Sequence, residues 1–321
     1  MNESARDARA GADRRPTVIA RHGARRLTGR VASPRADARL LLAYVLGCSP
    51  TGLVLAAPVD DTRLAAYVDL LDRRATGVPV QHLTGEAWFR GVRVEVGPGV
   101  FIPRPETELM AGAAVDALRA ADPGGGQRPL AVELCAGSGA ISAVVAEECP
   151  GARIVAIEVD PAALWWTRHN LEPRGIEVRA ADLGDPQPDL TGRADVVVAN
   201  PPYVPTAGRD PLPDDVAHHD PAIALYGGPD GLDVIRRVEV AARRLLRPGG
   251  VVLCEHDDSH RETAPKVFGR RPGAWREIAD HRDLAGRPRW LSAIRGPGAD
   301  APGADAPAPG TRRTGRGPVA G

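Results

Sequence analysis

The segment LAVELCAGSGAISAVVAEECPGARIVAIEVD, residues 130–160, packs two candidate strands, a glycine-rich turn and a helix into a short stretch. The runs 130–134 and 153–158 are predicted to be strands. Residues 140–148 between them are predicted to be helical. A strand, a helix and a strand in such close succession favour two parallel strands joined by a helix packed on the sheet.

The alternation of strands and helices continues along the chain. Further strands are predicted at 177–180, 196–199 and 251–255, and further helices at 161–170 and 231–247. The last such segment, DLAGRPRWLSAIR at 283–295, is a candidate for added strands at the edge of the sheet. This order of elements predicts a mostly parallel sheet with helices on both faces, a doubly wound α/β fold over residues 103–295.

Residues 17–78 have a different pattern, which predicts a small helical domain. Apolar side chains recur at helical spacing in ADARLLLAYVLG, 36–47, and in DDTRLAAYVDLLDRRATG, 60–77. Asp60 or Asp61 is a suitable N-cap for the second helix, and Gly77 a suitable stop. The domain has no cluster of catalytic residue types, so we expect a packing or partner-docking role.

A β-hairpin is predicted to link the two domains over residues 79–102. In GEAWFRGVRVEVGPGVFI, 85–102, valines alternate with charged residues before the turn-forming Gly97-Pro98-Gly99. Val100, Phe101 and Ile102 would then form the return strand. The two ends of the chain, 1–16 and 296–321, have few core-forming residues and are predicted to be disordered.

Composition excludes several classes of protein. The 41 Lys and Arg residues balance 41 Asp and Glu residues, so no basic field favours binding to nucleic acid. No apolar run reaches the length of a membrane span, about 18 residues, and the N-terminus lacks a secretory apolar core. The 4 cysteines have no zinc spacing and are expected to be reduced thiols. We therefore expect a cytoplasmic protein.

Polar and glycine residues follow three successive strands. Gly137 and Gly139 in the first turn would let the backbone approach a ligand at the amino end of a helix, although the third glycine of a dinucleotide fingerprint is missing. Glu158 ends the second strand, where an acid accepts hydrogen bonds from ribose hydroxyls. Asp182 follows the third strand and is a candidate ligand for an adenine amino group. Together they predict a nucleoside site.

The fourth strand runs into Asn200-Pro201-Pro202-Tyr203. Two consecutive prolines remove two backbone donors and fix two φ angles, so the sheet ladder ends and the loop is stiff. Such a loop lies at the carboxyl edge of the sheet, where open α/β sheets bind their ligands. The Asn200 side-chain oxygen and the Pro201 carbonyl are candidate acceptors for a planar amino or amide group.

These features together resemble the class I S-adenosylmethionine-dependent methyltransferases that alkylate planar amino or amide nitrogens. The segments GVFIPRPETELM, 99–110, VPVQHLTGEAWFRG, 78–91, and HHDPAIALYGGPDGLDVI, 218–235, are similar more specifically to the protein-(glutamine-N5) methyltransferases of the PrmC/HemK family. So are LLRPGGVVLCEHDD, 245–258, and DLAGRPRW, 283–290. The likeness covers about residues 30–295 in the family's order and includes the helical domain.

The resemblance implies both a reaction and a set of site residues. It implies methyl transfer from S-adenosylmethionine to the glutamine of the Gly-Gly-Gln loop in class 1 peptide chain release factors, by a monomer without metal, membrane or direct nucleic-acid partner. Arg104 and Glu106 would shape the entrance of the cleft. The implied glutamine pocket is Asn200, Pro201, Pro202 and Tyr203, and the implied cofactor contacts are Cys135, Ala136, Gly137, Ser138, Gly139, Glu158, Asp182, Leu183 and Asn200.

The sequence departs from the family pattern at a few positions. Cys135 stands where glycine is common, Glu133 and Glu158 where aspartate is common, and Leu183 where some members have an aromatic residue. Glu133 is expected either to hold the glycine loop or to contact the methionine ammonium.

Three alternatives stay open from the sequence. An adenine-N6 DNA or RNA methyltransferase shares the NPPY motif, although the balanced charge and the segment PRPETE, 103–108, disfavour it. A nucleotide-binding module without activity would not need the two acceptors of the NPPY loop. The acids and histidines in 218–220 and 255–260 resemble metal ligands, but polar loops have the same composition and methyl transfer requires no metal.

Overall fold

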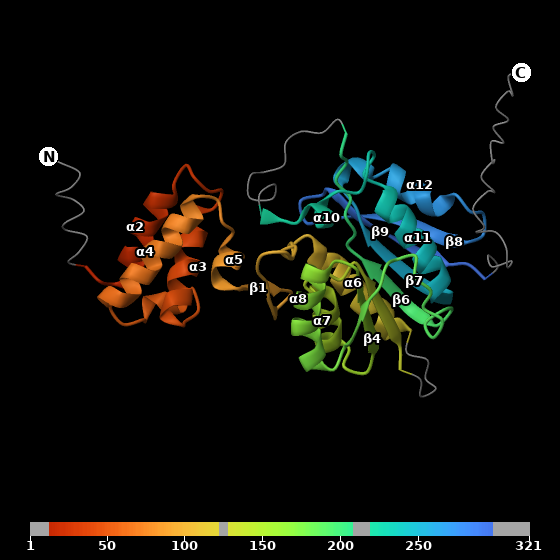
Figure 1. The fold of residues 1–321 in the computed structure, drawn as a ribbon, viewed down its shortest axis with the longest axis horizontal. Coiled ribbons are helices and arrows are strands. Elements are labelled where there is room, and N and C mark those ends of the chain that lie inside the picture. Colours follow the sequence, from red (N-terminus) through yellow and green to blue (C-terminus); the bar gives the residue numbers. More distant parts are fainter. Residues whose placement is uncertain (1–12, 122–127, 208–218, 298–321) are drawn as a thin grey trace, which may run out of the picture.

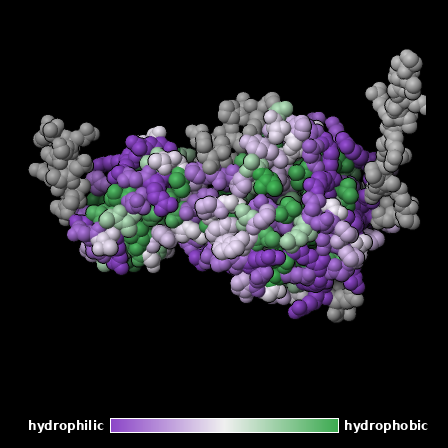
Figure 2. Space-filling view, in the orientation of Figure 1, coloured by the Kyte–Doolittle hydropathy of each residue, from purple (hydrophilic) through white to green (hydrophobic). Residues whose placement is uncertain are grey.

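The computed structural model describes residues 13–121, 128–207 and 219–297. Figure 1 shows a small helical lobe at the N-terminal end and a larger lobe built around a sheet, with a short helix and a hairpin between them. Polar side chains cover most of this face, and apolar patches lie on both lobes (Figure 2).

The helical lobe contains α2 (Pro16–Leu27), α3 (Pro34–Leu46), the 3-10 turn η1 (Gly52–Val54) and α4 (Asp61–Ala75). As predicted, Asp60 caps α4, and its carboxylate accepts from the Arg63 N–H at 2.8 Å. The Tyr67 hydroxyl, buried at the centre, donates to the Ala38 carbonyl at 3.0 Å. Leu27, Leu41 and Leu42 are fully buried around it, so this lobe has a core of its own.

The linking segment differs from its prediction. Residues 80–84 form helix α5 (Val80–Thr84), and the hairpin pairs β1 (Glu86–Phe89) with β2 (Val92–Glu95). Its turn is Arg90-Gly91, with φ of 47° and 79°, the left-handed geometry of a two-residue hairpin turn. A turn does form at Gly97-Pro98-Gly99, where the Val100 N–H donates to the Gly97 carbonyl at 3.4 Å, but it does not join the strands of the hairpin. The return strand predicted at 100–102 was wrong, because those residues are an irregular connection to the larger lobe.

The larger lobe is built on a seven-stranded sheet of order β5-β4-β3-β6-β7-β9-β8. The predicted strands are present as β3 (Leu130–Leu134), β4 (Arg153–Glu158), β5 (Glu177–Ala180), β6 (Ala194–Ala199) and β7 (Leu246–Glu255), all parallel. The predicted edge strands are β8 (Trp275–Arg282) and β9 (Pro288–Arg295), which run antiparallel. The fold is doubly wound, as the sequence indicated.

Helices cover both faces of this sheet (Figure 1). On one face, α6 (Thr107–Ala120), α7 (Ala140–Glu148) and α8 (Pro161–Leu171) bury apolar residues against the sheet. On the other, α11 (Asp233–Leu245) and α12 (Thr263–Gly269) do the same. Alternate residues of a strand serve the two layers: Ala131 belongs to the first core, and Val132 to the second.

The remaining elements are short. The 3-10 turns η2 (Glu172–Arg174) and η3 (Asp258–His260) and the helix α10 (Ala222–Leu225) lie in connections. The helix predicted at 231–247 is α11 and is shorter at both ends, because Leu246 already begins β7. No helix in the described part of the chain is long and apolar enough to cross a membrane.

The predicted disordered ends lie mostly outside the described residues. At the N-terminus the predicted boundary was placed too late, because Val59 donates to the Arg14 carbonyl at 2.9 Å and Pro16 begins α2. At the other end, the Gly296 N–H donates to the Ala274 carbonyl at 2.8 Å, which ties that residue to the fold.

Gly139, which precedes α7, provides a test of this packing. Its φ is 77°, and a Cβ there would lie 2.7 Å from Leu171 Cγ. Gly139→Ala is expected to cost about 1–2 kcal/mol for the left-handed backbone and a further ~1–3 kcal/mol for the overlap. Gly175→Ala is the matched control, because its φ is 72° and nothing lies within 4 Å of its Cβ. Urea unfolding measures the free energy of unfolding of both variants. Equal losses of this free energy would contradict the close packing of Gly139 against Leu171.

Candidate active site

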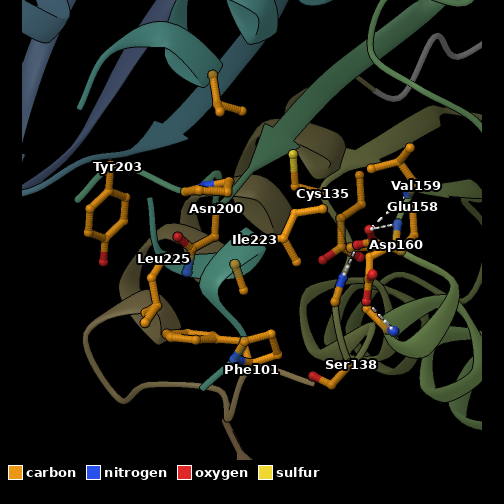
Figure 3. Close-up of a pocket in the computed structure, with 18 of the residues that line it drawn as sticks. Phe101, Cys135, Ser138, Glu158, Val159, Asp160, Asn200, Tyr203, Ile223 and Leu225 are labelled. Atoms are coloured by element: carbon orange, nitrogen blue, oxygen red, sulfur yellow. Dashed lines mark hydrogen bonds between the residues drawn. The ribbon is translucent and has the colours of Figure 1, made fainter. Parts of the chain in front are cut away.

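A cavity of about 560 Å³ opens at the carboxyl ends of β3, β4 and β6. Its walls come from segments far apart in the sequence, and several of their side chains converge on one space (Figure 3). Of the cofactor and glutamine contacts implied by the sequence, Gly139 and Pro201 are not part of the lining. The others do line it: Cys135, Ala136, Gly137, Ser138, Glu158, Asp182, Leu183, Asn200, Pro202 and Tyr203.

The glycine loop after β3 is held from several sides. Its backbone turns through left-handed φ angles at Cys135 (56°), Gly137 (56°) and Gly139 (77°). The Thr167 hydroxyl on α8 donates to the Gly137 carbonyl at 2.6 Å, and the Asn170 side chain donates to the Ser138 carbonyl at 2.9 Å. A left-handed conformation is unfavourable for a cysteine, so these contacts fix a backbone shape that the local sequence does not prefer.

Glu158 joins the loop to the end of β4. One carboxylate oxygen accepts from the Gly137 N–H at 2.8 Å, and the other accepts from the Val159 and Asp160 N–H groups at 2.8 and 2.9 Å. Each carboxylate oxygen can accept further bonds, so hydroxyl groups of a ligand in the cavity still find acceptors. Asp160 caps α8, where its side chain accepts from the Ala163 N–H at 2.9 Å.

Glu133 lies on β3 in the wall of the cavity and is buried. One of its oxygens accepts from the Ser142 N–H at 2.9 Å, at the amino end of α7. Burial raises the pKa of Glu133 to about 8, although the hydrogen bonds from Ser142 oppose this. The contact fits the role of holding the loop and helix together, whereas contact with a ligand ammonium stays a prediction.

Cys135 lines the same cavity. Burial, and then the negative charge of Glu158, raise the pKa of Cys135 well above its usual range. The group is therefore a neutral thiol at physiological pH and serves as a small apolar part of the wall.

The loop after β5 forms the next part of the wall. Asp182 accepts from the Gly184 N–H at 2.8 Å and forms an ion pair with Arg237 of α11. The Arg237 guanidinium holds the pKa of Asp182 below its ordinary value, so the carboxylate stays ionised. Leu183 packs between the cavity and the second core. Arg237 itself also lines the cavity and was not identified as a site residue from the sequence.

The NPPY loop supplies the opposite side of the cavity from the glycine loop (Figure 3). The Asn200 amide nitrogen donates to the Thr107 hydroxyl at 3.3 Å. The amide oxygen takes no part in this hydrogen bond. Pro201 is buried beneath the loop, while Pro202 is half-buried in the cavity wall. The Tyr203 hydroxyl donates to Glu255 Oε1 at 3.1 Å, so the loop is anchored to the end of β7.

A further wall comes from the connection before α6 and from α10. The Arg104 guanidinium pairs with Asp220 at 2.5 Å and lies 4.9 Å from the centre of the Phe101 ring. Of the two residues expected at the entrance, Arg104 lines the cavity, but Glu106 does not. Phe101, Thr107 and the α10 residues Ile223 and Leu225 were not identified from the sequence, because only the tertiary fold brings them to the cavity.

Histidines considered as metal ligands contact neighbouring groups of the protein. His256 is fully buried and lies 3.0 Å from Asp280, and the His260 ring is 3.0 Å from the Asp230 carbonyl. His218 lies outside the described residues. Within the described ranges, no group of three or more His, Cys, Asp or Glu residues is arranged to hold a metal ion.

Family models match two parts of the chain. Residues 19–85 match the PrmC N-terminal domain, and residues 117–211 match the methyltransferase small domain. The two matches divide the chain much as the helical lobe and the sheet lobe do.

Curated relatives cover most of the chain. A release factor glutamine methyltransferase of Streptomyces coelicolor is 45% identical over 82% of this chain and 92% of its own length. A 4-amino-L-phenylalanine/4-methylamino-L-phenylalanine methyltransferase of Streptomyces pristinaespiralis is 41% identical over 75% of this chain and 81% of its own length.

A solved structure, that of the hMettl16 catalytic domain in complex with a 3′UTR hairpin, is similar in fold. It is 16% identical with a TM-score of 0.50, and covers 71% of this chain and 82% of its own. The sheet order, the two family-model matches and the identity to curated relatives agree on one assignment. The chain belongs to the release factor glutamine methyltransferase family and has the class I methyltransferase fold, preceded by a PrmC N-terminal domain.

Proposed function

We propose that this enzyme transfers a methyl group from S-adenosylmethionine to the side-chain amide nitrogen of the glutamine in the Gly-Gly-Gln motif of class 1 peptide chain release factors. The observation that carries the proposal is the Asn200 amide. Its nitrogen is occupied by Thr107, so its oxygen is the atom left to accept from a substrate amide. The names of the relatives that cover most of the chain support the same reaction.

The cavity fits the cofactor in its size and in its charges. Its volume of about 560 Å³ is within the range of small-molecule sites. Glu158 would accept from the ribose hydroxyls, and Asp182 with Leu183 would border the adenine, while residues 135–139 would support the methionine end. Several carboxylates line the cavity, which suits a cation. When bound, the cofactor supplies an electrophilic methyl group on a positively charged sulfur.

The protein would contribute orientation and charge stabilisation to the reaction. An amide nitrogen is a weak nucleophile because its lone pair is delocalised, so both of its hydrogens must be gripped to aim it. Asn200 Oδ1 and the Pro201 carbonyl would accept these hydrogens and stabilise positive charge as it develops on the nitrogen. Tyr203 would border the flat face of the amide. On this proposal the enzyme works as a cytoplasmic monomer on a protein, without direct contact to nucleic acid.

A second acceptor class has specific support. The relative named for 4-amino-L-phenylalanine is 41% identical, and an arylamine is also a planar NH₂ group. The NPPY geometry alone does not separate it from an amide. We favour the protein acceptor because the release factor relatives reach 45% identity and because the helical lobe exposes apolar side chains to solvent.

We propose that this helical lobe docks the release factor. Leu55 is 92% exposed and Val54 is 70% exposed at its surface, next to a hollow bordered by Arg21, Arg25 and Arg39. Exposed apolar side chains beside cations suit a protein surface with apolar and acidic groups.

The acceptor is tested with purified enzyme and labelled S-adenosylmethionine. The label is expected in release factor and in a peptide that contains Gly-Gly-Gln, and not in duplex DNA or 4-amino-L-phenylalanine. Asn200→Ala should reduce transfer by about 100-fold or more, because a preorganised acceptor is lost, while cofactor binding changes little. Label in DNA or in the arylamine, with none in release factor, would contradict the proposal.

The cofactor site is tested by Glu158→Gln, with Glu177→Gln on the neighbouring strand as the matched control. Glu158→Gln is expected to weaken binding of S-adenosylmethionine by about 10- to 100-fold, because charge-assisted bonds are worth ~1.5–3 kcal/mol. Glu177 is more exposed and pairs with Arg153 and Arg179, so its variant should bind within about twofold of the parent enzyme. Titration calorimetry measures the affinity of both variants for S-adenosylmethionine. Equal losses of affinity would reject Glu158 as a ribose ligand.

The docking surface is tested by Leu55→Glu, with Leu284→Glu as the matched control because Leu284 is 94% exposed in the turn between β8 and β9. Leu55→Glu should raise KM for release factor by about 10-fold, the cost of ~1.4 kcal/mol of apolar contact. KM for a short Gly-Gly-Gln peptide should not change. An equal rise of KM for the peptide, or with Leu284→Glu, would place the docking surface elsewhere.

A further inference from the structure

A buried acid, Glu255, lies behind the NPPY loop and reaches the cavity only through other side chains. It is 3% exposed at the end of β7 and is not part of the cavity wall. Its Oε1 accepts from the Tyr203 hydroxyl at 3.1 Å. Its Oε2 is buried, and no well-aligned hydrogen bond reaches it from the described residues. A buried carboxylate oxygen of this kind is costly, so it calls for an explanation.

Thr107 connects this acid to the candidate site. It is 3% exposed at the first position of α6, and its hydroxyl accepts from the Asn200 amide nitrogen. Burial raises the pKa of the Glu255 carboxyl, and the Thr107 hydroxyl is the first of the neighbouring groups that lower it. A hydroxyl has one proton and two lone pairs. Thr107 can therefore accept from Asn200 and donate toward Glu255 at the same time.

The direction of these bonds decides which end of the Asn200 amide faces Thr107. An ionised carboxylate only accepts, so Glu255 draws the Thr107 proton toward itself. The Thr107 oxygen then presents a lone pair, to which only the Asn200 Nδ2 can donate. With Nδ2 held there, Oδ1 is the atom turned to the substrate.

We propose that Thr107 and Glu255 are positioning residues that fix the Asn200 amide with its oxygen toward the acceptor nitrogen. The inference rests on the proposed role of Asn200 and extends it to two residues behind the cavity wall. Tyr203 is held by the same carboxylate, so a single acid orients both polar side chains of the NPPY loop.

Protonation of Glu255 would reverse the bond directions. A neutral carboxyl can donate to Thr107, whose proton then points to Asn200 and favours the flipped amide with Oδ1 toward Thr107. The substrate would then meet an NH₂ group in place of an acceptor. Burial raises the pKa of Glu255 to about 7, so this change would occur near neutral pH. Methyl transfer should therefore increase as pH rises through about 7.

Other charged and titratable groups face this acid from each neighbouring element. Arg289 on β9 favours the ionised form, and Glu106 before α6 disfavours it. Tyr203 donates from the NPPY loop, and burial first, then Glu255, raise the Tyr203 pKa, so this phenol stays neutral. On the same strand, burial and then Glu255 raise the pKa of the Cys254 thiol.

The first experiment compares Thr107→Val, which has the same shape without the hydroxyl, with Thr107→Ser, which keeps it. Thr107→Val should lower kcat for methyl transfer by about 10- to 100-fold, as expected for a buried hydrogen bond lost at an oriented group. Affinity for S-adenosylmethionine should not change, and Thr107→Ser should stay within about threefold of the parent enzyme. A kcat for Thr107→Val within threefold of that for Thr107→Ser would overturn the inference.

The pH profile and an activity-free titration complete the test. The parent kcat should rise with a midpoint near pH 7, and Glu255→Gln should remove this midpoint; a retained midpoint would overturn the inference.

In the cofactor-free protein, carbon-13 NMR of the Glu255 carboxyl should show a higher midpoint in Thr107→Val than in Thr107→Ser. Equal titration midpoints of the Glu255 carboxyl in the two variants would also overturn the inference. The NMR titration needs no methyl acceptor, so it tests the inference even if the parent enzyme does not methylate release factor. That failure would refute the proposed function and leave the roles of Thr107 and Glu255 to be decided by the titration.

Discussion

The site depends on the parallel register of three strands and on the carboxylate that joins two of them. β3, β4 and β6 are paired so that Leu134, Ile157 and Ala199 stand side by side, and each strand then ends in a loop that lines the cavity. Glu158 binds the Gly137 N–H across this edge as well as two N–H groups of its own loop. The same acid therefore shapes the glycine loop and would bind the cofactor, which explains why a strained backbone at Cys135 is tolerated there.

The candidate active site then has two layers. Residues at the carboxyl edge of the sheet form the wall, and a second set of side chains holds them from behind. Glu133 ties the loop to α7, Asn170 ties it to α8, and Thr107 ties the NPPY loop to α6. These supporting side chains are buried and polar. Their hydrogen bonds inside the core of the sheet lobe hold the loops of the cavity in fixed positions.

The sequence was sufficient for the strands and for the residues that follow them. β3, β4 and β5 begin and end where predicted, because buried parallel strands have a strong compositional signal. The hairpin turn was misplaced, since Gly97-Pro98-Gly99 has stronger turn propensity than Arg90-Gly91, whereas the pairing of Phe89 with Val92 puts the turn at Arg90-Gly91. The roles of Thr107 and Arg237 could not be predicted, because Thr107 meets Asn200 across 93 positions and Arg237 meets Asp182 across 55.

The central claim is that Asn200 and the Pro201 carbonyl grip a planar amide beside the cofactor. A crystal structure with S-adenosylhomocysteine and a Gly-Gly-Gln peptide tests it most directly. We predict the glutamine nitrogen within hydrogen-bond distance of both Asn200 Oδ1 and the Pro201 carbonyl oxygen, with Asn200 Nδ2 still bonded to Thr107. A glutamine side chain held elsewhere in the cavity, or an Asn200 amide that presents its nitrogen to the peptide, would contradict the account.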